Sequence, residues 1–319
     1  MCHQCLIPSY RAKLTFAFAK CWCLGAILRG MIACFDTSVI NHLANDPRCE
    51  ELVVMVLSEM DVYITAVNVI EIAKTKNVDR REKLRKLAKQ LAKNLEPLAL
   101  PNELLESVAR AFQSRAENIV VTIPPDQREL WFLFSQPNAL LEGGREEITR
   151  WAKANENLHS EPAARLRDTI DRLFAAEPTK RPRGPADVLR QLIAGNWELH
   201  YSFPSQFYKL ATDRVLPLSR LDAFLEAGSG IWSVFLASVA LSVYYAAVWV
   251  PAHGSRSTVG VLDLWSAAYL PLCDTFVTND LKNGGQYEAL RITNTLNRRR
   301  PRTRVLRWSE FRAGIIQAE

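Results

Sequence analysis

Acidic residues stand beside short apolar runs at widely separated places in this sequence. Asp36 directly follows a β-prone run, and Asp280 follows a second such run with one residue between. Glu71 and Asp263 each fall near the start of a helix predicted from the residue pattern. Because the carboxyl ends of parallel strands meet at one edge of a sheet, we expect these four carboxylates to gather there. Such a cluster repels itself unless it holds a hard cation, Mg²⁺ or Mn²⁺.

Carboxylate-held divalent ions activate water and stabilise the transition state of phosphodiester cleavage. Each acid also has a simpler interpretation, which the residues alone leave open. Asp36, Thr37 or Ser38 could cap a helix by accepting hydrogen bonds from its first N–H groups. Glu71 could be no more than a favourable partner of a helix dipole. Thr65 or Asn68 could cap the helix that contains it.

Three segments resemble the motifs of the PIN (PilT N-terminus) domain family. The segment CFDTSVI, with Asp36, resembles its first motif, and ITAVNVIE, with Thr65 and Glu71, resembles its second. The segment DLWSAAYLPLCDTFVTND is similar to the third and fourth motifs, with Asp263 and Asp280 17 positions apart. The resemblance covers about a third of the chain.

The resemblance implies a parallel sheet flanked by helices and metal-dependent ribonuclease activity. Many family members are toxins of toxin–antitoxin modules, and others process or degrade RNA. By carry-over from the family motifs, the metal ligands and catalytic residues are Asp36, Glu71, Asp263 and Asp280. Thr278 matches a hydroxyl position that often helps to order the metal site. Further candidate supporting residues are Thr37, Ser38 and Asp274.

The spacing of the second and third motifs departs from compact family members, in which they lie close together. Here Asp263 comes 192 positions after Glu71. Leucines at helical spacing predict a helix over 81–95, and Pro101 with Asn102 marks the start of another. We therefore expect an α/β fold with a large all-helical insertion. The expected units are a leader (1–30), a PIN-like nuclease core (31–75 plus 257–319) and a helical insertion subdomain (76–256).

One segment of the predicted insertion, residues 227–255, contains no Asp, Glu, Lys or Arg. Its middle is long enough to cross a bilayer. A single crossing would separate Glu71 from Asp263, however, and both are expected at one site. We therefore expect a buried helix that packs against the sheet, with an interfacial or oligomer-forming helix as the alternative.

The cysteine count is odd, with seven in the chain, and four of them lie within the first 23 residues. This is not a secreted disulfide framework and favours a cytoplasmic location. Cys2, His3 and Cys5 invite a zinc interpretation, but the second pair, Cys21 and Cys23, is spaced too closely for usual zinc sites. Residues 1–30 weakly resemble a signal peptide, and a translated leader before Met31 is the other interpretation.

Basic residues concentrate in two places on a chain whose formal charge is +6. Residues 74–93 hold nine Lys or Arg against two acids, and residues 298–307 hold six Arg. A solvated surface is the simpler explanation for each run. The second run follows the strand before Asp280, where a phosphate backbone could pass. Its candidate nucleic-acid contacts are Arg298, Arg299, Arg300 and Arg302.

These observations together predict a metal-dependent nuclease, with endoribonuclease activity favoured and RNA as the partner. An antitoxin or other protein partner is a further expectation, as is an oligomer. Two alternatives remain: a catalytically silent PIN-like binding module, and a structure-specific DNA nuclease of the wider superfamily. Degenerate binding copies usually lose members of the acidic set, and here all four are present.

Overall fold

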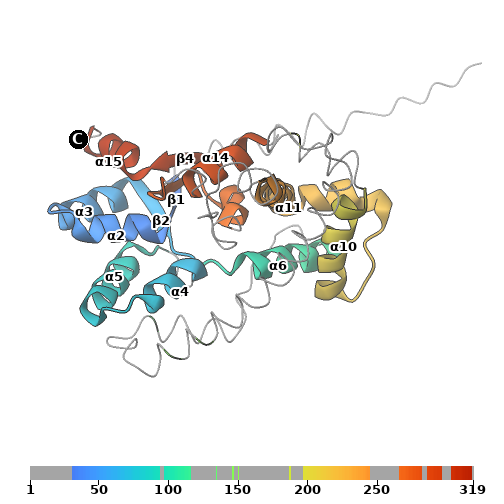
Figure 1. The fold of residues 1–319 in the computed structure, drawn as a ribbon, viewed down its shortest axis with the longest axis horizontal. Helices are drawn as coiled ribbons and strands as arrows, with labels where there is room; N and C mark the ends of the chain where they lie inside the picture. Colours follow the sequence, from blue (N-terminus) through green and yellow to red (C-terminus); the bar gives the residue numbers. More distant parts are fainter. Residues whose placement is uncertain are drawn as a thin grey trace, which may run out of the picture.

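The structure is a computed structural model of the chain. It describes residues 31–93, 97–115, 197–244, 266–281, 286–296 and 303–317, together with the single residues 134, 146, 150 and 187. The leader (1–30) lies outside the described residues, as do Asp263 and the arginines at 298–302. Figure 1 shows the arrangement of the helices and strands.

The described strands form one four-stranded, all-parallel sheet in the order β2-β1-β3-β4. The predicted strand before Asp36 is β1 (Met31–Phe35), and the predicted strand before Asp280 is β3 (Thr275–Thr278). These two strands lie side by side at the centre, flanked by β2 (Met60–Tyr63) and β4 (Arg304–Arg307). The α/β class and the parallel sheet are therefore confirmed.

One face of the sheet is covered by helices α2 (Thr37–Asn45), α3 (Cys49–Glu59), α5 (Val78–Leu91) and α15 (Trp308–Gln317). Alternate strand residues point to this face, as the pleat of a strand requires. Phe35 of β1 and Val277 of β3 are buried in its core. Phe35 packs edge-on against Phe311 of α15 with ring centroids 5.2 Å apart.

The opposite face carries Cys34 and Phe276, the intervening strand residues. It is covered by η4 (Ser266–Leu272), α6 (Pro101–Ser114), α10 (Trp197–Thr212), α11 (Leu221–Tyr244) and α14 (Gln286–Leu296). Helix α4 (Ala66–Lys74) contributes side chains to both cores. It thereby anchors the segment that carries Glu71.

Helix α11 contains the described part of the charge-free segment, up to Tyr244. It packs on η4, α14 and α6, and Trp232 and Phe235 are fully buried. The predicted burial of this helix is confirmed, but its main contacts are with other helices rather than with the strands of the sheet. Residues 245–255 lie outside the described residues. No helix in the described part of the chain has both the length and the apolar character to cross a membrane.

Two local features differ from what the residue pattern predicts. The segment TRVLRWSEF (303–311) has the pattern of a single last strand, but β4 ends at Arg307 and α15 begins at Trp308. The Glu310 carboxylate accepts a hydrogen bond from Arg307 N (2.9 Å), which satisfies an N–H group at the helix start. Pro271 predicts a boundary between elements, and the 3₁₀-helix η4 includes it and ends one residue later, at Leu272.

The predicted division into core and insertion stays a prediction. Helix α5 belongs to the expected insertion by its position in the sequence. It packs on α2 and α4, and its leucines join the same core as β1 (Figure 1). Most of residues 116–196 and all of 245–265 lie outside the described residues.

Candidate active site

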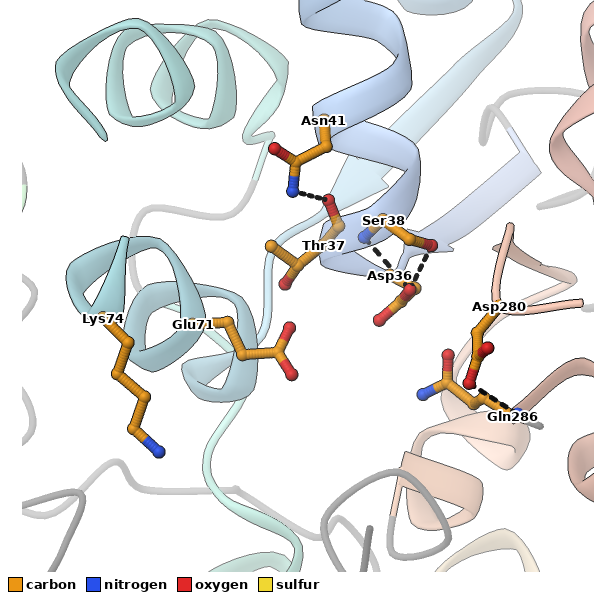
Figure 2. A pocket seen from close by; sticks show the side chains of 8 residues that line it. All are labelled: Asp36, Thr37, Ser38, Asn41, Glu71, Lys74, Asp280 and Gln286. Carbon is orange, nitrogen blue, oxygen red and sulfur yellow. Dashed lines mark hydrogen bonds between the residues drawn. The ribbon is translucent and has the colours of Figure 1, made fainter. Parts of the chain in front are cut away.

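A pocket of about 410 Å³ lies where β1 and β3 end, at the carboxyl edge of the sheet. Three of the four predicted acidic residues, Asp36, Glu71 and Asp280, line it. Figure 2 shows that they come from three separate places and that the Glu71 carboxylate is directed toward Asp36. The remaining lining residues are Thr37, Ser38, Asn41, Lys74 and Gln286.

Asp36 is fixed by hydrogen bonds to its backbone and its side chain. Its N–H donates to the Val277 carbonyl of β3 (2.9 Å), which ties the end of β1 to the neighbouring strand. Its Oδ2 accepts from Ser38 N (3.1 Å) and from the Ser38 hydroxyl, so Asp36 caps α2. The capping interpretation is therefore correct. It coexists with the pocket, since the second carboxylate oxygen points toward the Glu71 side (Figure 2).

Burial makes the charge of Asp36 costly. The residue is 9% exposed, and burial raises the pKa of its carboxyl above its ordinary value. Hydrogen bonds from Ser38, Thr37 and Thr278 oppose that rise. These donors are uncharged groups, so they stabilise the carboxylate without neutralising it. A cation in the pocket would act directly on this carboxylate.

Thr278 connects Asp36 to the residues that follow β3. Its hydroxyl lies 2.8 Å from Gln286 Oε1 and 3.3 Å from Asp36 Oδ2, and it accepts from Asp280 N (3.2 Å). One hydroxyl hydrogen can serve only one of the two acceptors at a time, and Gln286 is the nearer. Asp280 Oδ2 in turn accepts from Gln286 N (3.1 Å). The side chains on this flank of the pocket therefore position one another.

The residue after Thr278 joins the two flanks. Asn279 N donates to the Ser38 hydroxyl (2.9 Å), the same hydroxyl that donates to Asp36. Its side-chain nitrogen lies 2.6 Å from His42 Nε2 on the exposed side of α2. These contacts hold the segment that carries Asp280 against the start of α2.

Asn68 connects α4, which carries Glu71, to the end of β1. Its Nδ2 donates to the Phe35 carbonyl (3.0 Å) and to the Thr37 hydroxyl (3.1 Å). Its Oδ1 accepts from Thr65 N (2.9 Å) and Thr65 Oγ1 (3.0 Å). The side chain is thus fully satisfied although it is only 2% exposed. Glu71 is three residues further along the helix, on the same side.

The sequence suggested only a capping role for Asn68, and it did not indicate Asn41, Lys74 or Gln286. The predicted cap by Thr65 is confirmed, since its hydroxyl accepts from Asn68 N (3.2 Å). The ITAVNVIE pattern contains one sequence signal from which the role of Asn68 could have been predicted. A polar residue among buried apolar residues, three positions after a cap, must find partners, and in the structure these are Thr65 and the residues at the end of β1.

Asp274 does not line the pocket. Its Oδ2 accepts from Ile32 N (2.9 Å) and its own N–H donates to the Ile32 carbonyl (2.8 Å). It comes before β3, whereas Asp280 comes after it, so Asp274 lies at the amino edge of the parallel sheet. The structure gives no support to a role in the same site. Asp263, the remaining predicted ligand, lies outside the described residues.

The donor chemistry of the pocket suits a hard divalent ion. Carboxylates, amide oxygens and hydroxyls are the ligand types of Mg²⁺ and Mn²⁺, and Mg²⁺ needs only one or two carboxylates because it keeps several waters. Within the described ranges, no three His, Cys, Asp or Glu side chains form a group that could hold a metal by themselves. Asp36, Glu71 and Asp280 line the pocket without forming such a group, so an ion there would also need water, amide oxygens or a further ligand.

Comparison of the chain with models of protein families, with curated proteins and with solved structures gave no match. The functional argument therefore rests on the pocket itself.

Proposed function

We propose that this protein is a Mg²⁺- or Mn²⁺-dependent phosphodiesterase with a PIN-like active site, and that it acts as an endoribonuclease. One observation carries the proposal. Asp36, Glu71 and Asp280, from three separate elements, line one pocket at the carboxyl edge of an all-parallel sheet. Carboxylates gathered at that edge, with oxygen-rich neighbours, suit divalent cations and substrates with phosphate groups.

In this proposal Asp36, Glu71 and Asp280 hold the ion, and Asp263 is a fourth ligand. When bound, the ion activates water and offsets charge on the phosphate oxygens. The backbone N–H and the hydroxyl of Ser38 fix one oxygen of Asp36 by hydrogen bonds, so the other is directed into the pocket.

The other residues of the proposed mechanism keep the acids at fixed separations. Asn68 holds the helix that carries Glu71 against the end of β1. Gln286 N holds the Asp280 carboxylate. Fixed ligands cost little reorganisation when the reaction occurs.

The proposal is tested with labelled single-stranded RNA of mixed sequence, incubated with Mg²⁺, with Mn²⁺ or with EDTA. We expect internal cleavage that requires the metal in the parent protein and is lost in Asp36→Asn, Glu71→Gln and Asp280→Asn. A DNA oligonucleotide of the same sequence is the comparison substrate. Cleavage of DNA alone would replace the proposal with a DNA nuclease, and cleavage of neither would support a silent binding module.

A cytoplasmic location and an antitoxin-like protein partner belong to the same proposal. They are supported by the cysteine distribution and the family resemblance. Fractionation of cells that produce the tagged chain tests the location, and co-purification from them, followed by identification of bound protein and RNA, tests the partner.

A further inference from the structure

Eight of the nine basic residues of the run 74–93 form two sets of side chains in the structure, and Lys89 is the ninth. Some of its members have structural partners. Arg81 and Arg85 are buried and donate to the carbonyls of Thr75 (2.7 Å) and Phe134 (2.9 Å). Arg85 and Lys86 lie 2.7 and 4.0 Å from Glu82, and Lys93 lies 3.5 Å from Asp61. These residues stabilise α5 and its contacts.

The second set is exposed and begins at the pocket. Lys74 lines the pocket at the last residue of α4. Lys76 follows in the link to α5, and Arg80 and Lys83 lie on the first turns of α5. Within the described residues, Lys76, Arg80 and Lys83 take part in no ion pair. The only acid on the first turn of α5 is Asp79, at the positive end of the helix dipole.

A hydrogen bond joins this second set to the wall of the pocket. Arg80 Nη2 donates to Asn41 Oδ1 (3.0 Å), and Asn41 lines the pocket. Helix α5 packs beside α2 and α4, and Lys83 lies one turn beyond Arg80 on the same side of α5. Because α5 lies beside α4 (Figure 1), the basic positions of this set lead from the pocket along the first turns of α5.

We propose that Lys74, Lys76, Arg80 and Lys83 form a basic track that binds the phosphate backbone of single-stranded RNA beside the carboxylate pocket. The inference rests on the proposed function and names the surface by which that site would hold its substrate. Carboxylates repel phosphates, so a strand that enters the pocket needs cationic anchors on its flank. Lys and Arg supply these anchors without reading the base sequence.

The track predicts a measurable salt dependence of RNA binding. For single strands the slope of log K against log[salt] is about −0.7 for each phosphate neutralised, so four contacts give about −2.8. The probe is a fluorescein-labelled 12-nucleotide RNA in EDTA, followed by anisotropy from about 50 to 200 mM salt. EDTA removes cleavage from the measurement, so binding is read separately from the proposed activity.

The variant Arg80→Gln/Lys83→Gln removes two charges, and Gln at position 80 can still donate to Asn41. We expect the slope to fall to about −1.4 and the affinity at low salt to drop at least tenfold. Lys209→Gln/Arg214→Gln is the matched control, because it removes two exposed charges, one in the last turn of α10 and one just after it, on the opposite side of the sheet from α5. We expect the control to keep the parent slope.

The outcomes separate the track from the nuclease. If the parent cleaves RNA and both double variants keep its affinity and slope, the track is wrong and the nuclease stands. If the Arg80→Gln/Lys83→Gln variant loses affinity but the parent shows no metal-dependent cleavage, the RNA-binding track is supported and the proposed nuclease activity is contradicted. Binding to anionic lipid vesicles without binding to RNA would overturn the track as an RNA surface.

Discussion

Two aspartates join the central strands β1 and β3 at opposite edges of the sheet. At the carboxyl edge, Asp36 N donates to the Val277 carbonyl, and at the amino edge, Asp274 N donates to the Ile32 carbonyl. The Asp274 carboxylate accepts from the backbone of Ile32, the same strand residue. The Asp36 carboxylate caps a helix and faces a pocket with Glu71 and Asp280. The two residues share their type and their backbone role, and they differ in their edge of the sheet, their burial and the partners of their side chains.

The difference shows why the direction of a parallel strand matters. Helices that follow parallel strands begin at the carboxyl edge, so their N-terminal N–H groups and polar caps collect there. At the amino edge an acid meets the first N–H groups of the strands and is satisfied by them. We therefore expect changes at the carboxyl edge to affect chemistry and changes at the amino edge to affect stability alone.

The largest expected effect is the contrast between Asp36→Asn and Asp274→Asn. We expect Asp36→Asn to lower kcat/KM for metal-dependent RNA cleavage about 1,000-fold, or ~4 kcal/mol of transition-state free energy. Asp274→Asn should keep the parent rate, because the amide oxygen still accepts from Ile32 N. The measurement is initial cleavage rate with Mn²⁺ at equal protein concentration. Equal losses in the two variants would remove the distinction between the edges.

The second contrast concerns buried side chains that hold each edge. Asn68→Ala leaves buried groups of Thr65 and Phe35 without their partner, and we expect it to cost about 3 kcal/mol of unfolding free energy. At the amino edge, the Thr303 hydroxyl lies within hydrogen-bond distance of the carbonyls of Leu270 and Cys273, and it can donate to one of them at a time. Thr303→Val should cost about 1 kcal/mol.

Activity separates these two buried substitutions further. We expect cleavage to fall in Asn68→Ala even at temperatures where it is folded, because Glu71 loses its fixed position, and to persist in Thr303→Val. Urea unfolding and cleavage rates measured at low temperature check both statements. Full activity in folded Asn68→Ala would mean that Glu71 needs no such support.

Metal binding gives a third contrast, which does not depend on substrate. A ligand that binds the native state at 100 times its Kd stabilises it by about 2.7 kcal/mol. We expect Mn²⁺ to raise the Tm of the parent and of Asp274→Asn, with no rise for Asp36→Asn. Thermal unfolding with and without Mn²⁺ measures this. A rise of the same size in Asp36→Asn would place the ion elsewhere.

The smallest expected effect is the pH dependence of the metal-free protein. The pKa of Asp36 is raised in the folded state by burial, above its ordinary 3.8. At pH values between the ordinary pKa and the raised pKa of the folded state, the native state binds more protons than the unfolded state. The free energy of unfolding therefore falls as pH rises through this window. Asp36→Asn lacks this loss and still caps α2, so above the window it should melt no lower than the parent. Urea unfolding from pH 4 upward checks this, and a parent that gains stability relative to Asp36→Asn across the window would contradict it.

The sequence by itself determined much of the central fold. Short β-prone runs predicted strands β1 and β3, because the tendency to form a strand is a local property of the chain. Leucine spacing predicted a helix over 81–95, and the structure has α5 over Val78–Leu91, so the helix was predicted but its bounds were not. Polar residues after those strands predicted that Asp36 and Asp280 would belong to one edge. The residue pattern overestimated the length of β4. The helix that follows β4 is capped by a contact of the Glu310 side chain, and the strand pattern gives no sign of that contact.

The tertiary structure alone decided which polar residues meet. It placed Asp274 at the amino edge and out of the pocket, although it lies only six positions before Asp280. It brought Asn68 to the end of β1, and Gln286 and Lys74 to the wall of the pocket. It also divided the basic run into buried, paired and exposed members. The physical reason is that strand order and helix packing join residues distant in sequence, and local periodicity carries no information about those contacts.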